Sequence, residues 1–276
     1  MPVTWPPDGL PDLVARLRAA GCVYAEEEAA LLLETADDED ELAAMVERRV
    51  AGLPLEQVLG WAAFYGLRIL VDPGVFVPRR RTEWLVARAV ALAPPRPLVV
   101  DLCCGSGAVG AALRAALEDV ELYAVDVDPA AVRCARRNVP ADRVLGGDLF
   151  DPLPSTLRGH VDLLVVNAPY VPSGELRLMP SEARDHEPRV ALDGGGDGLD
   201  VHRRVAAEAP TWLRPGGRLL IETGVRQAGT AAALFTAAGL VPDVAVSHDL
   251  DVAVVTGTAT GPVDPASCSP RRPVGA

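Results

Sequence analysis

A glycine-rich loop between an apolar run and a helical pattern constrains the fold of this chain more than any other feature. The apolar run Leu98–Leu102 leads into Gly105, Gly107 and Gly110, which are spaced as G-x-G-x-x-G. A second apolar run ends at Asp126, about 20 residues further on. In this setting the loop brings the backbone close to a nucleotide at a helix N-terminus, and the carboxylate can accept hydrogen bonds from the ribose hydroxyls. The pattern therefore predicts a nucleotide site at the end of a strand.

Apolar runs and helical periods alternate from residue 97 almost to the end of the chain. Such alternation predicts a parallel sheet with helices on both faces, which is a doubly wound α/β fold. A helix is expected from Thr82, its N-cap, to the prolines at 94 and 95. The expected strands are 98–102, 122–125, 161–166 and 218–221, followed by two final strands near 244–246 and 252–256.

The segment before this alternation has a different organisation. Three amphipathic periods predict a small helical domain. Aromatic and β-branched residues follow, broken by Gly66 and by Asp72-Pro73-Gly74, and this pattern predicts a β-hairpin linker. The C-terminal end is rich in proline and glycine, so we expect it to be disordered. The predicted divisions are 1–56 for the helical domain, 57–78 for the linker, 79–258 for the α/β domain and 259–276 for the tail.

Composition excludes several classes of function. The formal net charge is −12, with 26 basic residues that are all arginine, which disfavours binding to duplex nucleic acid and leaves no lysine for a Schiff base. The five cysteines form no CxxC pair and have no histidine cluster beside them, so we expect a reduced protein without a metal site. No apolar run is long enough to span a membrane and no secretory signal is evident, which predicts a cytoplasmic protein.

The glycine loop alone leaves two cofactors open. A dinucleotide would seat its pyrophosphate on the helix N-terminus, whereas S-adenosylmethionine has no phosphate and presents a cationic sulfonium and an amino-acid end. Asp101 stands just before the loop, and an acidic residue at this position favours S-adenosylmethionine. The segment Gly146–Phe150 stands between the expected strands 122–125 and 161–166, at the third strand position of the alternation. There Asp148 could accept a hydrogen bond from an adenine amine while Leu149 packs on the ring.

The tetrapeptide Asn167-Ala168-Pro169-Tyr170 follows the expected strand 161–166 and should face the ligand crevice of a doubly wound sheet. The side-chain and backbone groups of this tetrapeptide are suited to hold the planar nitrogen of an amide or an amine. The Asn167 side-chain oxygen and the Ala168 carbonyl could accept hydrogen bonds from an NH₂ group, and Tyr170 could offer an aromatic face. Pro169 restricts Ala168 to the extended region. Catalysis would then rest on positioning and electrostatics.

These motifs resemble a known family. The segments Asp101–Gly107, Asp126, Gly147–Phe150 and Asn167–Tyr170 look like the motifs of class I S-adenosylmethionine-dependent methyltransferases. Together with Gly52–Gly60, Pro78–Glu83, Arg184–Gly195 and Leu213–Gly217, they make roughly residues 10–257 similar to the protein-(glutamine-N5) methyltransferases of the HemK or PrmC family, which modify the GGQ glutamine of peptide-chain release factors.

The resemblance implies a Rossmann-like catalytic domain, a helical N-terminal domain for substrate recognition, S-adenosylmethionine as cofactor and a release factor as protein substrate. Asn167, Ala168, Pro169 and Tyr170 would be catalytic. The cofactor-binding residues would be Asp101, Gly105, Ser106, Gly107, Asp126, Asp148, Leu149 and Asn167.

Two departures from the family pattern point to a divergent paralogue. The family tetrapeptide is Asn-Pro-Pro-Tyr, whereas Ala168 stands here in place of the first proline, and Ser247–Val252 lacks the usual basic residues. Three alternatives stay open at this stage: a methyltransferase for exocyclic amines of nucleic acids, a catalytically silent cofactor-binding subunit, and a nicotinamide oxidoreductase.

Overall fold

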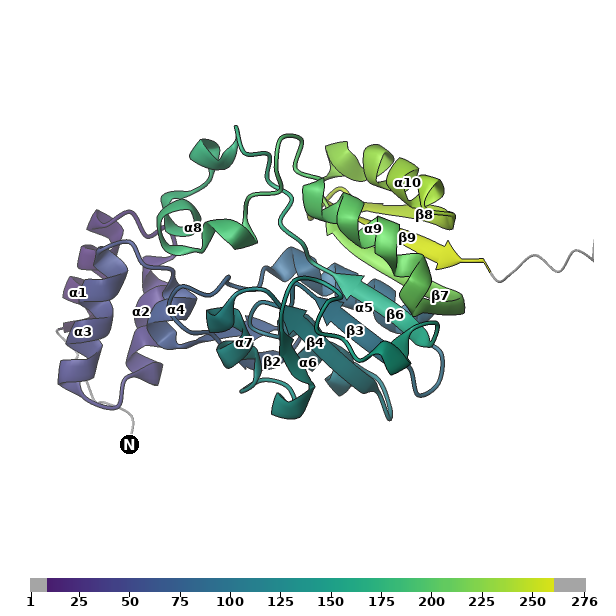
Figure 1. Ribbon diagram of the computed structural model, residues 1–276. Coiled ribbons are helices and arrows are strands. Elements are labelled where there is room, and N and C mark those ends of the chain that lie inside the picture. The colour runs from purple at the N-terminus through teal and green to yellow at the C-terminus, as the bar shows by residue number, and fades with distance from the viewer. Residues whose placement is uncertain (1–8, 261–276) are drawn as a thin grey trace, which may run out of the picture.

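A seven-stranded sheet forms the centre of the computed structural model, which describes residues 9–260 (Figure 1). The strand order is β5-β4-β3-β6-β7-β9-β8. Most of the predicted tail, 259–276, lies outside the described residues. The strands are β3 (Leu98–Leu102), β4 (Glu121–Asp126), β5 (Val144–Gly146), β6 (Val161–Val166), β7 (Leu213–Thr223), β8 (Leu240–Ser247) and β9 (Val252–Ala259).

The sheet confirms the doubly wound α/β prediction but is not parallel throughout. Strands β5, β4, β3, β6 and β7 run parallel, whereas β9 pairs antiparallel with both β7 and β8. The connection between β8 and β9 is only a short turn, which is too short for the crossover that parallel strands need. Chain order reverses between β3 and β6, so the carboxyl ends of these two strands flank the topological switch point, where doubly wound sheets bind ligands.

Helices cover both faces of the sheet because successive side chains of a strand point to opposite faces. Val99 and Val165 pack with α5 (Glu83–Leu92), α6 (Ala108–Ala116) and α7 (Pro129–Ala135). Val100 and Val166 pack on the other face with α9 (Asp200–Trp212) and α10 (Ala228–Ala237). Both faces are therefore buried, as the continuous apolar strands predict.

The N-terminal helices form a separate core at one end of the sheet (Figure 1). They are α1 (Gly9–Ala19), α2 (Ala25–Thr35), α3 (Glu39–Val50) and α4 (Leu55–Leu59), and their core includes Leu17, Leu32 and Leu42. The Asp38 carboxylate caps α3 by accepting from the Glu41 N–H at 2.8 Å. The predicted boundary at residue 56 falls inside α4, which packs into this core.

A two-stranded hairpin links the helical unit to the sheet. Strands β1 (Trp61–Phe64) and β2 (Leu67–Leu70) pair antiparallel around Tyr65 and Gly66, which both have positive φ, as a two-residue hairpin turn requires. The hairpin ends at Leu70, so residues 71–78 of the predicted linker are irregular.

Thr82 stands at the N-cap position of α5, as predicted, but its side chain does not cap the helix. Thr82 ends a 3₁₀ turn, η1 (Arg80–Thr82), and its backbone is already helical, so its side chain makes no capping hydrogen bond to α5. A capping residue needs an extended backbone to turn its hydroxyl back toward the first free N–H groups. The Thr82 hydroxyl is therefore available to the functional site described below.

The helical unit also contacts the long segment between β6 and α9. This segment carries the short helix α8 (Ser181–His186), which lies toward α1–α4 in Figure 1. Arg49 of α3 forms a buried ion pair with Glu28, with Nε 2.6 Å from Oε2, and its Nη1 donates to Glu182 of α8 at 2.7 Å. Among residues 9–260, no helix combines the length and apolar character needed to cross a membrane.

Candidate active site

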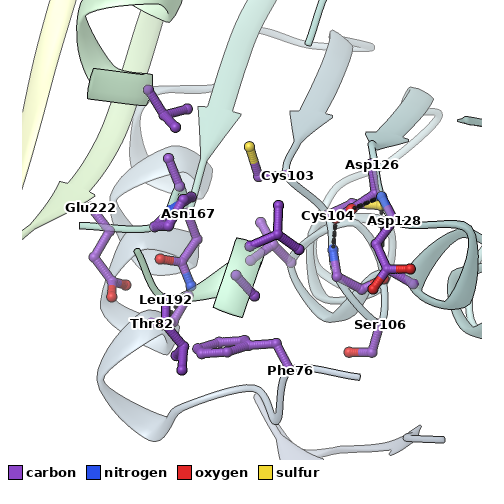
Figure 2. A pocket seen from close by; sticks show the side chains of 18 of the residues that line it. Phe76, Thr82, Cys103, Cys104, Ser106, Asp126, Asp128, Asn167, Leu192 and Glu222 are labelled. Atoms are coloured by element: carbon purple, nitrogen blue, oxygen red, sulfur yellow. Dashed lines mark hydrogen bonds between the residues drawn. The ribbon is translucent and has the colours of Figure 1, made fainter. Parts of the chain in front are cut away.

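A pocket of about 320 Å³ opens at the carboxyl ends of β3, β4 and β6 (Figure 2). Its position follows from the strand order, because the loops after these strands emerge at the same edge of the sheet. Every site residue predicted from the sequence lines it, with the exception of Gly107. Those residues are Asp101, Gly105, Ser106, Asp126, Asp148, Leu149, Asn167, Ala168, Pro169 and Tyr170.

Gly107 does not line the pocket, and its role is structural. Its φ of +79° is in the left-handed region that favours glycine, and it is the residue from which α6 begins. A Cβ atom there would lie 3.2 Å from the Cβ of Ala135 in α7. The second glycine of the loop thus lets the chain turn from β3 into α6 close to a neighbouring helix.

The Asp126 carboxylate is held by two backbone groups at the end of β4. Its Oδ2 accepts from the Gly105 N–H at 2.8 Å, and its Oδ1 accepts from the Asp128 N–H at 2.9 Å. Burial raises the pKa of Asp126. Because each carboxylate oxygen has a second lone pair, Asp126 can still accept hydrogen bonds from a ligand in the pocket.

Asp101 is buried under the glycine loop with 1% of its surface exposed. Its Oδ2 accepts from the Gly110 N–H at 2.9 Å. Burial, with a smaller contribution from the charge of Asp126, raises the pKa of Asp101 to about 7. A carboxyl group with a pKa near 7 is partly protonated at neutral pH. A cationic ligand in the pocket would favour its ionised form, so Asp101 is suited to bind one.

Asp148 and Leu149 follow β5 and line the same side of the pocket. Leu149 is buried, whereas the Asp148 Oδ2 accepts from Arg204 Nη2 of α9 at 2.7 Å, an ion pair that the sequence did not predict. Asp128 lines this side too. The glycine-loop side of the pocket is therefore mostly acidic, which opposes a pyrophosphate and favours a cation.

Asn167 lies at the end of β6 with its amide in the pocket (Figure 2). Its Nδ2 donates to the Thr82 Oγ1 at 3.4 Å. Ala168, the residue that departs from the family pattern, is 2% exposed and packs its methyl group into the core beneath the pocket. The side chain at position 168 therefore points into the protein.

The loop Asn167–Tyr170 is held by contacts with Gln227 and with the glycine-rich segment Gly194–Gly198. The Tyr170 carbonyl accepts from Gln227 Nε2 at 3.0 Å. A Cβ atom at Gly194 would lie 2.7 Å from the Pro169 carbonyl oxygen and 2.4 Å from the Gly198 carbonyl oxygen. Close approach of two backbones thus holds the Asn167–Tyr170 loop, although no second proline is present in it.

The half-buried Tyr170 and the buried Glu222 form a hydrogen-bonded pair beside Asn167. The Tyr170 hydroxyl donates to Glu222 Oε1 at 3.0 Å, and Arg81 Nε is 3.8 Å from the same oxygen. Burial raises the pKa of Glu222 and, with the Glu222 charge, that of Tyr170. His202 of α9 is buried, which lowers its pKa to about 4, and its Nε2 is 3.1 Å from the Glu222 carbonyl oxygen.

Sequence reasoning missed several groups of this pocket, namely Phe76, Arg81, Thr82, Met179, Val190 and Glu222. One signal was available for Glu222, because it lies next to the carboxyl end of β7, which is the parallel neighbour of the strand that leads into Asn167. Phe76 lies in the irregular part of the linker, where no periodicity places a side chain. Figure 2 shows its ring beside Thr82 at the bottom of the view.

Cys103 lines the pocket, but burial raises the pKa of its thiol well above the ordinary value. A neutral thiol is a poor nucleophile. His186 ends α8 and is not among the residues that line the pocket. Within residues 9–260, no group of three or more His, Cys, Asp and Glu side chains is arranged to hold a metal ion.

Comparison with known proteins matches this architecture. Residues 66–183 match the family model of the methyltransferase small domain. The chain is 39% identical to a release factor glutamine methyltransferase of Mycolicibacterium smegmatis, with 87% of each chain covered, and 40% identical to one of Geobacter sulfurreducens, with 72% of each covered.

One similar protein has a different named substrate. A 4-amino-L-phenylalanine/4-methylamino-L-phenylalanine methyltransferase of Streptomyces pristinaespiralis is 40% identical, with 70% of this chain and 69% of that protein covered. Among solved structures, a methyltransferase of Pyrococcus furiosus shares the fold at a TM-score of 0.54 and 15% identity, over 79% of this chain and 98% of that one.

Proposed function

Because the chain belongs to the release factor glutamine methyltransferase family, we propose that its pocket binds S-adenosylmethionine at the glycine-rich loop and a glutamine side chain at Asn167–Tyr170. The protein is an S-adenosylmethionine-dependent enzyme that methylates the N5 atom of glutamine. The substrate that the family name supports is a peptide-chain release factor, and the resemblance of the motifs implies its GGQ glutamine.

The glycine-loop side fits this cofactor better than a dinucleotide. S-adenosylmethionine, when bound, supplies a methyl group activated by a positively charged sulfur. Asp126 would accept from the ribose hydroxyls, and Asp101 would pair with the amino group of the methionine end; both line the pocket. Leu149 would pack on the adenine, and Asp148 would accept from its amine. These carboxylates would repel the pyrophosphate of a dinucleotide.

The Asn167 side of the pocket fits a carboxamide. The Asn167 Oδ1 and the Ala168 carbonyl would accept hydrogen bonds from the two protons of the glutamine NH₂, and Tyr170 would cover one face of the amide. An amide nitrogen is a weak nucleophile, so fixing its direction of attack is the main contribution that the protein can make. The observation that carries the proposal is that Asn167 and Tyr170 share one pocket with Asp101 and Asp126.

The test separates cofactor binding from chemistry. Asn167→Ala should retain S-adenosylmethionine binding in calorimetry, because the carboxylates of the glycine-loop side remain. It should lower methyl transfer to a release factor about 100-fold or more, as the loss of a preorganised polar group does in other enzymes. Turnover equal to that of the wild type would refute the role of Asn167. Mass spectrometry of the product should place the methyl group on a glutamine.

A small aromatic amine is a second candidate substrate, because the Streptomyces pristinaespiralis relative is named for one. The apolar side chains of Phe76, Met179 and Leu192 line the pocket and could pack on an aromatic ring. Parallel assays with 4-amino-L-phenylalanine and with a release factor distinguish the two candidates. We expect the release factor to be methylated with the higher kcat/KM.

Nucleic acid is a weaker candidate. The one local run of basic residues, Arg79 to Arg81, is largely engaged with carboxylates. Arg79 pairs with Glu187, with Nη2 2.5 Å from Oε2, and Arg81 is directed at Glu222. These contacts and the net charge of −12 leave little positive potential for a phosphate backbone. Transfer of labelled methyl groups to total RNA or DNA would overturn this inference.

A further inference from the structure

The direction in which the Asn167 amide faces decides what residue 167 can recognise. An asparagine carries an acceptor oxygen on one side and a donor NH₂ group on the other. The proposed function requires Oδ1 to face the NH₂ group of the substrate glutamine. The Nδ2 of Asn167 must then have an acceptor within the protein, because the reverse orientation would present a donor to a donor.

Thr82 provides that acceptor. Its Oγ1 lies 3.4 Å from Asn167 Nδ2, and the residue is 2% exposed. Since the backbone of Thr82 is helical, its hydroxyl is not used to cap α5. In Figure 2 the amide end of Asn167 lies close to Thr82. A hydroxyl can both accept and donate, however, so Thr82 fixes the Asn167 amide only if its own proton is directed elsewhere.

Glu222 is the group that can take this proton. Only 1% of the residue is exposed, and its Oε1 accepts from the Tyr170 hydroxyl. Its Oε2 is buried and has no hydrogen-bond partner within the described part of the chain. The Thr82 hydroxyl is close enough to lower the pKa of Glu222, against the stronger effect of burial. A buried carboxylate oxygen without a partner is costly, so Glu222 Oε2 would be stabilised by a proton from a neighbouring hydroxyl.

We propose that Thr82 and Glu222 are positioning residues that set the orientation of the Asn167 amide and so make the pocket selective for a carboxamide over a carboxylate. Glu222 Oε2 accepts the Thr82 proton, Thr82 Oγ1 accepts from Asn167 Nδ2, and Asn167 Oδ1 is left facing the substrate. The same carboxylate holds the Tyr170 hydroxyl through Oε1, so one buried group orients both residues. This inference rests on the proposed function, because it assigns the specificity of that same site.

The selectivity can be measured with a release factor and a form of it that carries glutamate in place of the methylated glutamine. The glutamate form presents two acceptors to the Asn167 and Ala168 oxygens, so we expect it to be a weak competitive inhibitor of the wild type. Thr82→Val removes the hydroxyl at nearly constant volume and frees the Asn167 amide to turn. Loss of one hydrogen bond then predicts a fall in kcat of about tenfold and a similar shift of the inhibition constant in favour of the glutamate form.

Thr82→Ser keeps the hydroxyl and should restore the preference for glutamine. Glu222→Gln should act like Thr82→Val, because a glutamine NH₂ group donates to Thr82 and so turns the Thr82 proton toward Asn167. Thr211→Val is a matched control, since Thr211 is exposed on α9 and is not among the residues that line the pocket. The affinity for S-adenosylmethionine, measured by calorimetry, reports whether each variant is folded.

The outcomes separate the inference from the proposed function. A Thr82→Val enzyme that binds the cofactor and keeps the wild-type preference for glutamine over glutamate would overturn the inference, whatever its rate. If Thr82→Val does not bind the cofactor, the preference of Glu222→Gln for glutamine over glutamate is measured instead, and an unchanged preference would likewise overturn the inference. A wild-type enzyme that does not methylate glutamine at all would instead refute the proposed function, and the inference with it. A fall in rate without a change in selectivity would indicate a purely structural role for the pair and would also overturn the inference.

Discussion

The buried carboxyl of Asp101 should make the protein less stable as the pH rises. Its pKa in the folded protein is about 7, against an ordinary value of 3.8, so the folded state holds a proton that the unfolded state has lost between these two pH values. The folded state therefore gains stability from this group below pH 4 and loses it as the pH rises through 7. At about 1.4 kcal/mol for each pH unit, the loss amounts to about 4 kcal/mol.

Asp101→Asn removes this titration and retains an oxygen that can accept from the Gly110 N–H. The free energy of unfolding of the variant, minus that of the wild type, should therefore increase by about 4 kcal/mol between pH 4 and pH 8. Urea unfolding of both proteins at a series of pH values measures this difference. Other buried carboxyls titrate in both proteins, so the comparison isolates Asp101.

Asp142→Asn is the matched control, because the Asp142 side chain is 81% exposed. This variant measures the effect of removing one surface carboxyl group, against which the profile of Asp101→Asn is compared. A flat profile for Asp101→Asn would refute the argument that burial holds this carboxyl near neutrality. If Asp101 pairs with the amino group of the cofactor, the same variant should bind S-adenosylmethionine about 10- to 100-fold more weakly, which is the usual value of a hydrogen bond to a charged group. The more stable variant would then be the less active one.

Two further predictions concern packing and ion pairing. Gly110→Ala would place a Cβ 2.9 Å from Leu122 Cδ2, so overpacking should lower the free energy of unfolding by about 1–3 kcal/mol, and an unchanged urea midpoint would contradict the close packing described here. Arg49→Met would leave the Glu28 carboxylate buried without its partner and should cost about 3–5 kcal/mol. The double variant Arg49→Met/Glu28→Leu should recover much of this loss in urea unfolding, and failure to recover it would indicate that the contact with Glu182 matters more.

Much of the fold could be predicted because its signals are local. Apolar runs bounded by glycine and proline identified the strands, and the span from Gly105 to Asp126 placed a nucleotide site at the edge of the sheet. The carboxyl ends of parallel strands share one edge, so the order of the strands alone brings Asp126 and Asn167 to the same crevice. The antiparallel end of the sheet was missed, since the direction of a short strand depends on its connection and not on its composition.

The sequence by itself determined the class of fold, the cofactor side of the pocket and the Asn167–Tyr170 segment, because each depends on residues that are near one another in the chain. Only the tertiary structure decided which side chains surround Asn167. Thr82 and Glu222 are separated from it by 85 and 55 positions, and the Thr82 backbone conformation that releases its hydroxyl follows from packing rather than from a motif. A hydrogen-bond network between distant segments leaves no periodic trace in a sequence, so the orientation of the Asn167 amide could be inferred only once the strands were assembled.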